Sequence, residues 1–191
     1  KEYAEADISS FPATGTTNPG ARGNRGDHEV AYNEAYSKTQ ALNFTDWTLS
    51  VEGRVDRPTQ ISLAALKALP ARTQITRHTC EEGWTAIAKW TGVPLSVVLS
   101  QAGIMSNARF VNFYAYDGYM ESIDMMDALH PQTILAYAMN DQSLPVQHGA
   151  PVRLRVETQI GYKSVKYLQK IVVTDEFVDT GDSGWAWYTG I

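Results

Sequence analysis

Cysteine is almost absent from this sequence, which has one, Cys80, among its 191 residues. A single thiol cannot close a disulfide within the chain, and its surroundings lack the Cys and His spacing of a zinc finger or ribbon. Two interpretations remain open. A free cysteine is often an inert, small apolar residue, but residues 77–84 are mainly polar or charged. Such neighbours favour a thiolate that binds one soft metal whose other ligands come from a cofactor.

Long apolar runs and an excess of basic residues are also missing. No stretch approaches the roughly 18 apolar residues that span a bilayer, and residues 1–5 lack the apolar core of a signal peptide. We therefore predict no membrane span. The 16 Lys and Arg residues against 21 Asp and Glu give a net charge of −5, which argues against nucleic-acid binding. One cysteine fits both a reducing cytosol and an exported protein without disulfides.

The chain has the length and the apolar content of one domain. Turn-forming residues are frequent in its first part, so we interpret residues 1–46 as an irregular arm that wraps the domain. Residues 47–191 form the main domain, and the acidic segment after Thr174 is expected to be a loosely structured tail.

Alternation of apolar and polar residues predicts strands, and helix start and stop residues predict short helices. The predicted strands are residues 47–53, 73–79, 134–139, 152–157 and 168–174, and the predicted helices are residues 63–69, 94–102 and 125–129. A hairpin of residues 110–116 and 119–124 is predicted around Asp117-Gly118, a dipeptide favoured in two-residue type I′ turns. These elements indicate a mixed α+β fold rather than a doubly wound sheet, with Cys80 at the carboxyl end of a strand.

Basic residues gather in the second half of the sequence. The cluster consists of Arg153, Arg155, Lys163, Lys166 and Lys170, opposed by one acid, Glu157. Gly161 permits a close backbone approach, while hydroxyl and ammonium groups nearby are donors that suit a phosphate. The alternative is a solvated strand face with alternating arginines. A proline-bounded loop just upstream brings His148 into the same neighbourhood.

Four ordered motifs together resemble one known family. They are residues 80–84, 135–145, 148–154 and 161–168. Taken with residues 31–36, they resemble the molybdopterin-binding domain of the sulfite oxidase family over residues 47–173. The resemblance implies that family's α+β fold of mixed sheets with short helices, and a Mo-molybdopterin cofactor.

The resemblance also implies a role for each matching residue. Cys80 would be the protein's ligand to molybdenum, and Tyr119 resembles the tyrosine that the sulfite-oxidising branch places beside the metal, although simple packing explains a tyrosine there equally well. Asn33 and Tyr36 would contact the pterin from the arm. The polar and phosphate end of the cofactor would be held by His148, Arg153, Ser164, Val165 and Lys166.

Departures from the family pattern narrow the function. Residues 32–36 replace the Arg-Asn-His sequence of sulfite oxidases and are closer to the branch that contains the periplasmic methionine sulfoxide reductase catalytic subunit. Ser37 and Ala115 depart from that branch too. The chain lacks the carboxyl-terminal dimerisation domain and the haem domain of some members, so we expect a monomer.

These observations predict an oxidoreductase that transfers an oxygen atom, with two electrons, to or from a small sulfur-oxo or nitrogen-oxo substrate. Electrons would be exchanged with an external protein, such as a cytochrome or a membrane haem subunit, and the family suggests the periplasm. One alternative is a non-catalytic domain of the same fold that binds an anion or a partner. Another is a cofactor-free thiol enzyme with Cys80 as nucleophile and His78 or His148 as base.

Overall fold

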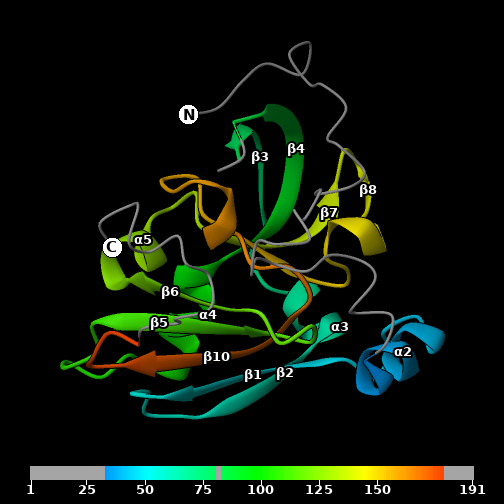
Figure 1. Cartoon of the computed structure of the whole chain (residues 1–191). Helices are drawn as coiled ribbons and strands as arrows, with labels where there is room; N and C mark the ends of the chain where they lie inside the picture. The colour runs from blue at the N-terminus through cyan, green and yellow to red at the C-terminus, as the bar shows by residue number, and fades with distance from the viewer. Residues whose placement is uncertain (1–32, 81–82, 179–191) are drawn as a thin grey trace.

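The computed structural model describes residues 33–80 and 83–178 and shows two five-stranded sheets (Figure 1). The order of the first sheet is β2-β1-β10-β5-β6; in the second it is β3-β4-β7-β8, with β9 also paired to β7. Strand β1 runs parallel to β10, and the other pairs are antiparallel. The predicted mixed α+β architecture is thereby confirmed. Most of the predicted arm and nearly all of the predicted tail lie outside the described residues.

The bounds of the elements are as follows. The first sheet contains β1 (Thr48–Gly53), β2 (Thr59–Ser62), β5 (Phe110–Ala115), β6 (Met120–Asp124) and β10 (Leu168–Thr174). The second contains β3 (Arg72–Thr79), β4 (Thr85–Pro94), β7 (Ile134–Met139), β8 (Gln142–Ser143) and β9 (Arg153–Arg155). The helices are α2 (Glu34–Ala41), α3 (Leu63–Lys67), α4 (Leu95–Ala102) and α5 (Met125–Leu129), and two 3-10 turns are η2 (Val146–His148) and η3 (Gly161–Lys163).

Four of the strands and helices were not predicted from the sequence. Strands β2, β4 and β8 were missed, and α2 lies where an irregular arm was expected. Helix α2 begins at Asn33, whose side-chain oxygen accepts a hydrogen bond from the backbone N–H of Tyr36 at 2.9 Å. In β4 the inward positions are Ala86, Ala88 and Trp90, and small alanines conceal a strand because their β-propensity is low.

The type I′ turn predicted at Asp117-Gly118 is wrong. That turn needs positive φ at both central residues, and here only Gly118 has it, at 82°. The loop has three residues and is closed by a hydrogen bond of 2.9 Å from the Ala115 N–H to the Tyr119 carbonyl. The Tyr119 N–H donates to the Asp117 carboxylate within the loop. Positive φ at two successive residues occurs instead between β7 and β8, at 140–141.

The main apolar core lies on one face of the first sheet. Helix α4 covers part of it and buries one stripe of side chains: Leu95, Val98, Leu99 and Ala102. Their i, i+3, i+4, i+7 spacing is that of a helix with one apolar face. A smaller apolar cluster around Trp90 belongs to the second sheet. The fold thus supplies two sheets, and Cys80 and the anion-binding candidates of residues 153–166 lie at the ends of strands of the second.

Within residues 33–80 and 83–178, none of the helices has the length and apolar character to cross a membrane.

Gly92 is expected to be essential for the contact between β4 and β7. A methyl group there would lie 2.3 Å from the Leu135 carbonyl oxygen and 2.6 Å from Ala136 Cα. We predict that Gly92→Ala lowers the free energy of unfolding by about 3 kcal/mol because backbone cannot move aside as a side chain can. Urea unfolding measures this loss.

The matched control is Gly118→Ala, where φ is 82° but no atom lies within 4 Å of the added methyl group. It should cost about 1 to 2 kcal/mol, the strain of a positive φ alone. Equal losses in the two variants would contradict the steric explanation.

Candidate active site

Cys80 follows directly after β3 and is half-buried. Its N–H donates to the Trp84 carbonyl at 2.9 Å. Alternate residues of β3 are buried, namely Gln74, Thr76 and His78, and Cys80 continues this series because side chains two apart share a face. The strand therefore carries the thiol at its carboxyl end, as predicted.

The turn η3 packs directly against this strand end. A methyl group on Gly161 would lie 3.3 Å from Cys80 Cα and 2.5 Å from His78 Nε2. Sequence analysis assigned Gly161 to a close approach of backbone and phosphate. In the structure the close approach is to the protein itself, and it brings the segment that continues to Lys166 beside Cys80.

Four of the five residues of the predicted basic cluster are buried. Arg153, Arg155, Lys163 and Lys166 are at most 8% exposed, so a solvated strand face is the wrong interpretation for them. Lys170 differs, because it lies on β10 in the first sheet, has a side chain 39% exposed and pairs with Glu52 at 3.5 Å. Lys170 is therefore separate from the four buried residues of the cluster.

Two of these four cations have buried carboxylate partners. Arg155 Nη2 lies 2.8 Å from the Glu157 carboxylate, and Lys163 Nζ lies 2.9 Å from that of Glu121. Sequence reasoning noted Glu157 but missed the role of Glu121. The available signal was the acid Glu121 within a predicted hairpin strand. If such a position is buried, its carboxylate needs a partner, because an unpaired carboxylate is rarely buried.

Arg153 is held differently. Its guanidinium donates to the carbonyl oxygens of His148 at 3.1 Å and Ser164 at 3.0 Å, and no ion pair with a carboxylate is formed in the part of the chain that the structure describes. Burial, and then the charge of Arg155, lowers the pKa of Arg153 to about 9. The group stays charged at neutral pH, in a position that an anionic ligand would stabilise.

Lys166 lies next to the loop that carries His148. Its ammonium donates to the Gln147 carbonyl at 2.9 Å. A methyl group on Gly149 would lie 2.7 Å from Lys166 Cβ, and φ of Gly149 is 99°, so glycine is required there. His148 itself is 5% exposed.

Ser164 and Val165 complete this neighbourhood. Ser164 Oγ accepts from the N–H of Val156 at 3.3 Å, and the Val165 carbonyl accepts from the N–H of Leu154 at 2.8 Å. The structure thus brings together the five residues predicted to hold the polar end of a cofactor. We call them the anion site: His148, Arg153, Ser164, Val165 and Lys166.

The anion site and Cys80 are neighbours. Burial lowers the pKa of His78 well below its usual range, and the charges of Arg155, Arg153 and Lys166 lower it further. These charges reach His78, which is two residues from Cys80 on the same strand face. The thiol and the guanidinium of Arg153, which has no ion pair among the described residues, therefore lie in one region near β3, β9 and η3.

The two residues predicted in the arm, Asn33 and Tyr36, hydrogen-bond to backbone carbonyls of neighbouring loops. Asn33 donates from its side chain to the Tyr116 carbonyl at 2.6 Å. Tyr36 is fully buried, and its hydroxyl donates to the Ala150 carbonyl at 2.7 Å, beside Gly149. Both hold loops of the site, while a direct contact with a pterin stays a prediction.

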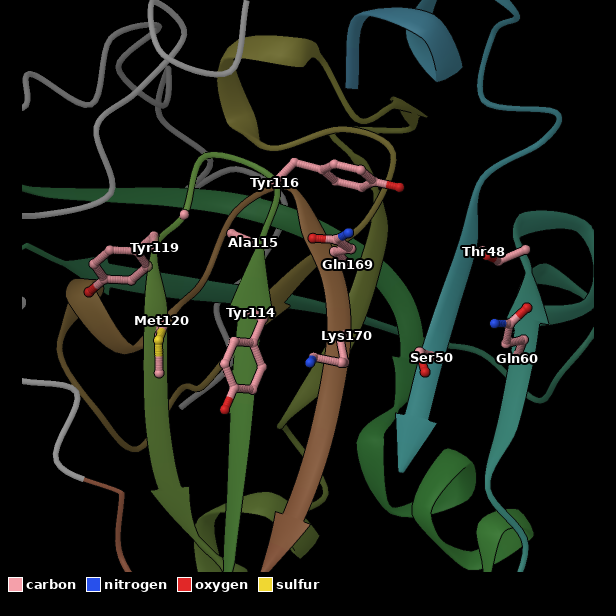
Figure 2. Close-up of a pocket in the computed structure, with 11 residues that line it drawn as sticks. Thr48, Ser50, Gln60, Tyr114, Ala115, Tyr116, Tyr119, Met120, Gln169 and Lys170 are labelled. Atoms are coloured by element: carbon pink, nitrogen blue, oxygen red, sulfur yellow. The ribbon is translucent and has the colours of Figure 1, made fainter. Parts of the chain in front are cut away.

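Tyr119 lies at the edge of a groove on the face of the first sheet. Figure 2 shows its side chain and that of Tyr116 leaving the hairpin turn in opposite directions. The groove has a volume of about 400 Å³ and, of the predicted site residues, is lined by Tyr119 alone. The Tyr119 hydroxyl donates to the Tyr162 carbonyl at 2.9 Å. Tyr119 therefore supports η3, and a catalytic role stays a prediction.

Comparisons with known proteins identify the family. The model of the oxidoreductase molybdopterin binding domain matches residues 36–180. A protein of Azospira oryzae assigned provisionally as protein-methionine-sulfoxide reductase subunit YedZ1 is 41% identical over 155 residues, which cover 80% of this chain and 59% of that protein. The protein-methionine-sulfoxide reductase catalytic subunit MsrP of Xanthomonas campestris is 32% identical over 157 residues, covering 74% and 49%.

The fold has a solved counterpart as well. The sulfane dehydrogenase SoxCD from Paracoccus pantotrophus superposes with a TM-score of 0.66 at 23% identity, over 69% of this chain and 39% of that one. This likeness confirms the sulfite-oxidase-type fold predicted from the sequence. The chain spans between about half and three fifths of the length of the curated relatives named above. Because the family model covers most of the chain, the protein belongs to the oxidoreductase molybdopterin-binding domain family, as its resemblance to the sulfite oxidase family predicted.

Proposed function

We propose that this protein binds Mo-molybdopterin through Cys80 and the anion site, and that it reduces a sulfoxide. The observation that carries the proposal is the buried guanidinium of Arg153 in the neighbourhood of the single thiol. Among the described residues Arg153 forms no ion pair, and it donates to the carbonyl oxygens of His148 and Ser164. A phosphate monoester carries about −1.5 to −2 charges at neutral pH.

The residues present fit such a cofactor. Arg153 and Lys166 are the two cations of the anion site that would hold its phosphate, and charge-assisted hydrogen bonds to phosphate oxygens are among the strongest in proteins. Cys80 offers the soft thiolate that suits a transition metal with sulfur ligands. When bound, the cofactor supplies the two-electron chemistry and most of the metal's ligands. The protein holds it, orients the thiolate and excludes water.

The direction of the reaction and the substrate class follow from the relatives. Two of them bear the name protein-methionine-sulfoxide reductase. The reaction proposed here consumes one sulfoxide, two electrons and two protons and gives one thioether and one water. The electrons come from an external redox protein, such as a cytochrome or a membrane haem subunit. We place the protein in the periplasm, as the family resemblance of the sequence suggests.

A cofactor-free thiol enzyme is less well supported. It needs a basic imidazole beside Cys80 to remove the thiol proton. Burial and three neighbouring cations lower the pKa of His78 well below its usual range, which makes it a weak base. His78 is also committed through Nδ1 to Arg155 at 2.5 Å.

Replacing Cys80 by Ser tests the metal ligand. An alkoxide is harder than a thiolate and much less readily formed, so Cys80→Ser should abolish sulfoxide reduction with a reduced viologen dye as electron donor. Elemental analysis for molybdenum and the fluorescence of the released, oxidised pterin report cofactor content. Full activity of the variant with metal bound would refute the assignment.

Replacing Lys166 by Ala tests the anion site, and Lys170→Ala is its matched control. The two lysines are four positions apart, but only Lys166 is buried beside Arg153. We expect Lys166→Ala to lower cofactor occupancy by about tenfold because a charged hydrogen bond is worth about 1.5 to 3 kcal/mol, and Lys170→Ala to leave it unchanged. Pterin fluorescence per protein measures both, and equal occupancy in the two variants would contradict the proposal.

Replacing Tyr119 by Phe separates its two roles. Loss of the bond to the Tyr162 carbonyl should lower the free energy of unfolding by about 1 kcal/mol. If Tyr119 also contacts the substrate, kcat per bound molybdenum falls as well. A loss of stability alone leaves this value unchanged while the protein stays folded. A variant with normal kcat would restrict Tyr119 to support of η3.

A further inference from the structure

His78 lies between one of the buried cations, Arg155, and the turn η3 beside the thiol. It is 7% exposed and lies two residues before Cys80 on β3. One edge of its ring meets Arg155, and the other meets Gly161. The proposed function uses neither His78 nor the Arg155–Glu157 pair, so the purpose of this buried arrangement is a separate question.

The edge that meets Arg155 is fixed by hydrogen bonds. Arg155 Nη1 lies 2.5 Å from His78 Nδ1. A guanidinium only donates, so Nδ1 is the acceptor and the ring carries its proton on Nε2. Arg155 is itself held by Glu157, through Nε at 3.1 Å and Nη2 at 2.8 Å. Its guanidinium also stacks over Trp90 at 4.6 Å.

The opposite edge is fixed by packing. A methyl group on Gly161 would lie 2.5 Å from His78 Nε2 and 2.7 Å from Cε1. The ring therefore fills the space between Arg155 and the start of η3. Because η3 leads directly to Ser164 and Lys166, the position of the ring sets the distance between Cys80 and the anion site.

We propose that His78 is a positioning residue: its imidazole, oriented by the Arg155–Glu157 pair, holds η3 against Cys80 and so fixes the thiolate relative to the phosphate-binding segment. The consequence for the reaction rests on the proposed function. The arrangement of His78, Arg155 and Gly161 does not, because it is a set of contacts within the protein.

Two substitutions separate the two edges of the ring. In His78→Asn the amide oxygen stands near the place of Nδ1 and still accepts from Arg155, but nothing reaches Gly161. In His78→Gln the amide nitrogen reaches the place of Nε2 and refills the contact with Gly161. A third variant, Arg155→Met, removes the hydrogen bond to His78 Nδ1. His130→Gln is the matched control, since His130 ends α5 and accepts from the Gln132 N–H at 3.2 Å.

The first measurement uses the protein without cofactor. Long-range nitrogen–proton NMR spectra of histidine-labelled protein should show His78 protonated at Nε2 and not at Nδ1, and Arg155→Met should shift both nitrogens. The Gly161 amide resonance should move in His78→Asn and stay near its original position in His78→Gln. A Gly161 resonance that is unchanged in both variants, or a proton on Nδ1, would overturn the proposal.

The second measurement uses the molybdenum-loaded protein. In His78→Asn, kcat for sulfoxide reduction should fall about 10-fold to 100-fold, while KM and molybdenum content stay within about twofold. The electron paramagnetic resonance spectrum of the Mo(V) state should change in His78→Asn, because it reports the orientation of the thiolate. His78→Gln should recover most of kcat and the original spectrum, and His130→Gln should match the unsubstituted protein.

The two proposals fail in different ways. Unsubstituted protein that takes up no molybdenum contradicts the proposed function, while the NMR result still decides the role of His78. Molybdenum-loaded His78→Asn with the original kcat and spectrum overturns the positioning role and leaves the proposed function intact.

Discussion

The buried guanidinium of Arg153 is the constraint on which the site depends. A charge removed from water is stable only where other groups replace its hydration. Arg155 and Lys163 obtain this from Glu157 and Glu121, whereas Arg153 has the carbonyl oxygens of His148 and Ser164. Carbonyl dipoles satisfy donors without cancelling the charge, so among the described residues Arg153 keeps a positive field around it. A thiolate and a phosphate are both anions, and that field would stabilise both.

The turn η3 contacts both sheets, and these contacts fix its position in the site. Lys163 joins it to Glu121 of β6 in the first sheet, and Gly161 packs on His78 of β3 in the second. Apolar burial has no direction, but a buried ion pair has a preferred geometry. Removing one partner of such a pair typically costs about 3 to 5 kcal/mol. The position of η3 is therefore set by a directional ion pair on the side of the first sheet and by close packing on His78 on the side of the second.

Local patterns in the sequence predicted much of the fold. The bounds of β7, β10 and α5 agree with the sequence prediction residue by residue, because apolar content, alternation and flanking prolines all act over a few residues. The strand β9 is shorter than predicted, at Arg153–Arg155, since the Val156 N–H turns to Ser164 Oγ instead of to β7. Strand β4 was missed because its small inward residues give little signal.

The sequence named the residues of the candidate site but not the contacts between them. Motif resemblance named the residues of the anion site, and the structure brings them together. The pairing of Arg155 with His78 spans 77 positions and that of Lys163 with Glu121 spans 42, and no local pattern specifies such partners. The sequence also grouped Lys170 with the others. Tyr167 has a φ of 53° and redirects the chain between Lys166 and β10, which separates two lysines that look equivalent in the sequence.

The buried cations differ in their partners, and this difference indicates whether the charge of each is balanced by folding or by a ligand. Arg155 and Lys163 meet their carboxylates as the chain folds, so their desolvation is offset in the protein without ligand. Arg153 is only partly compensated until an anion arrives, because carbonyl oxygens leave its charge in place. A ligand that binds the folded state alone stabilises it by mass action, and here the gain includes the charge that folding left uncompensated. Its donors are already fixed by bonds to His148 and Ser164, so little ordering opposes binding. The proposed affinity for a phosphate thus rests on a charge that folding leaves only partly compensated.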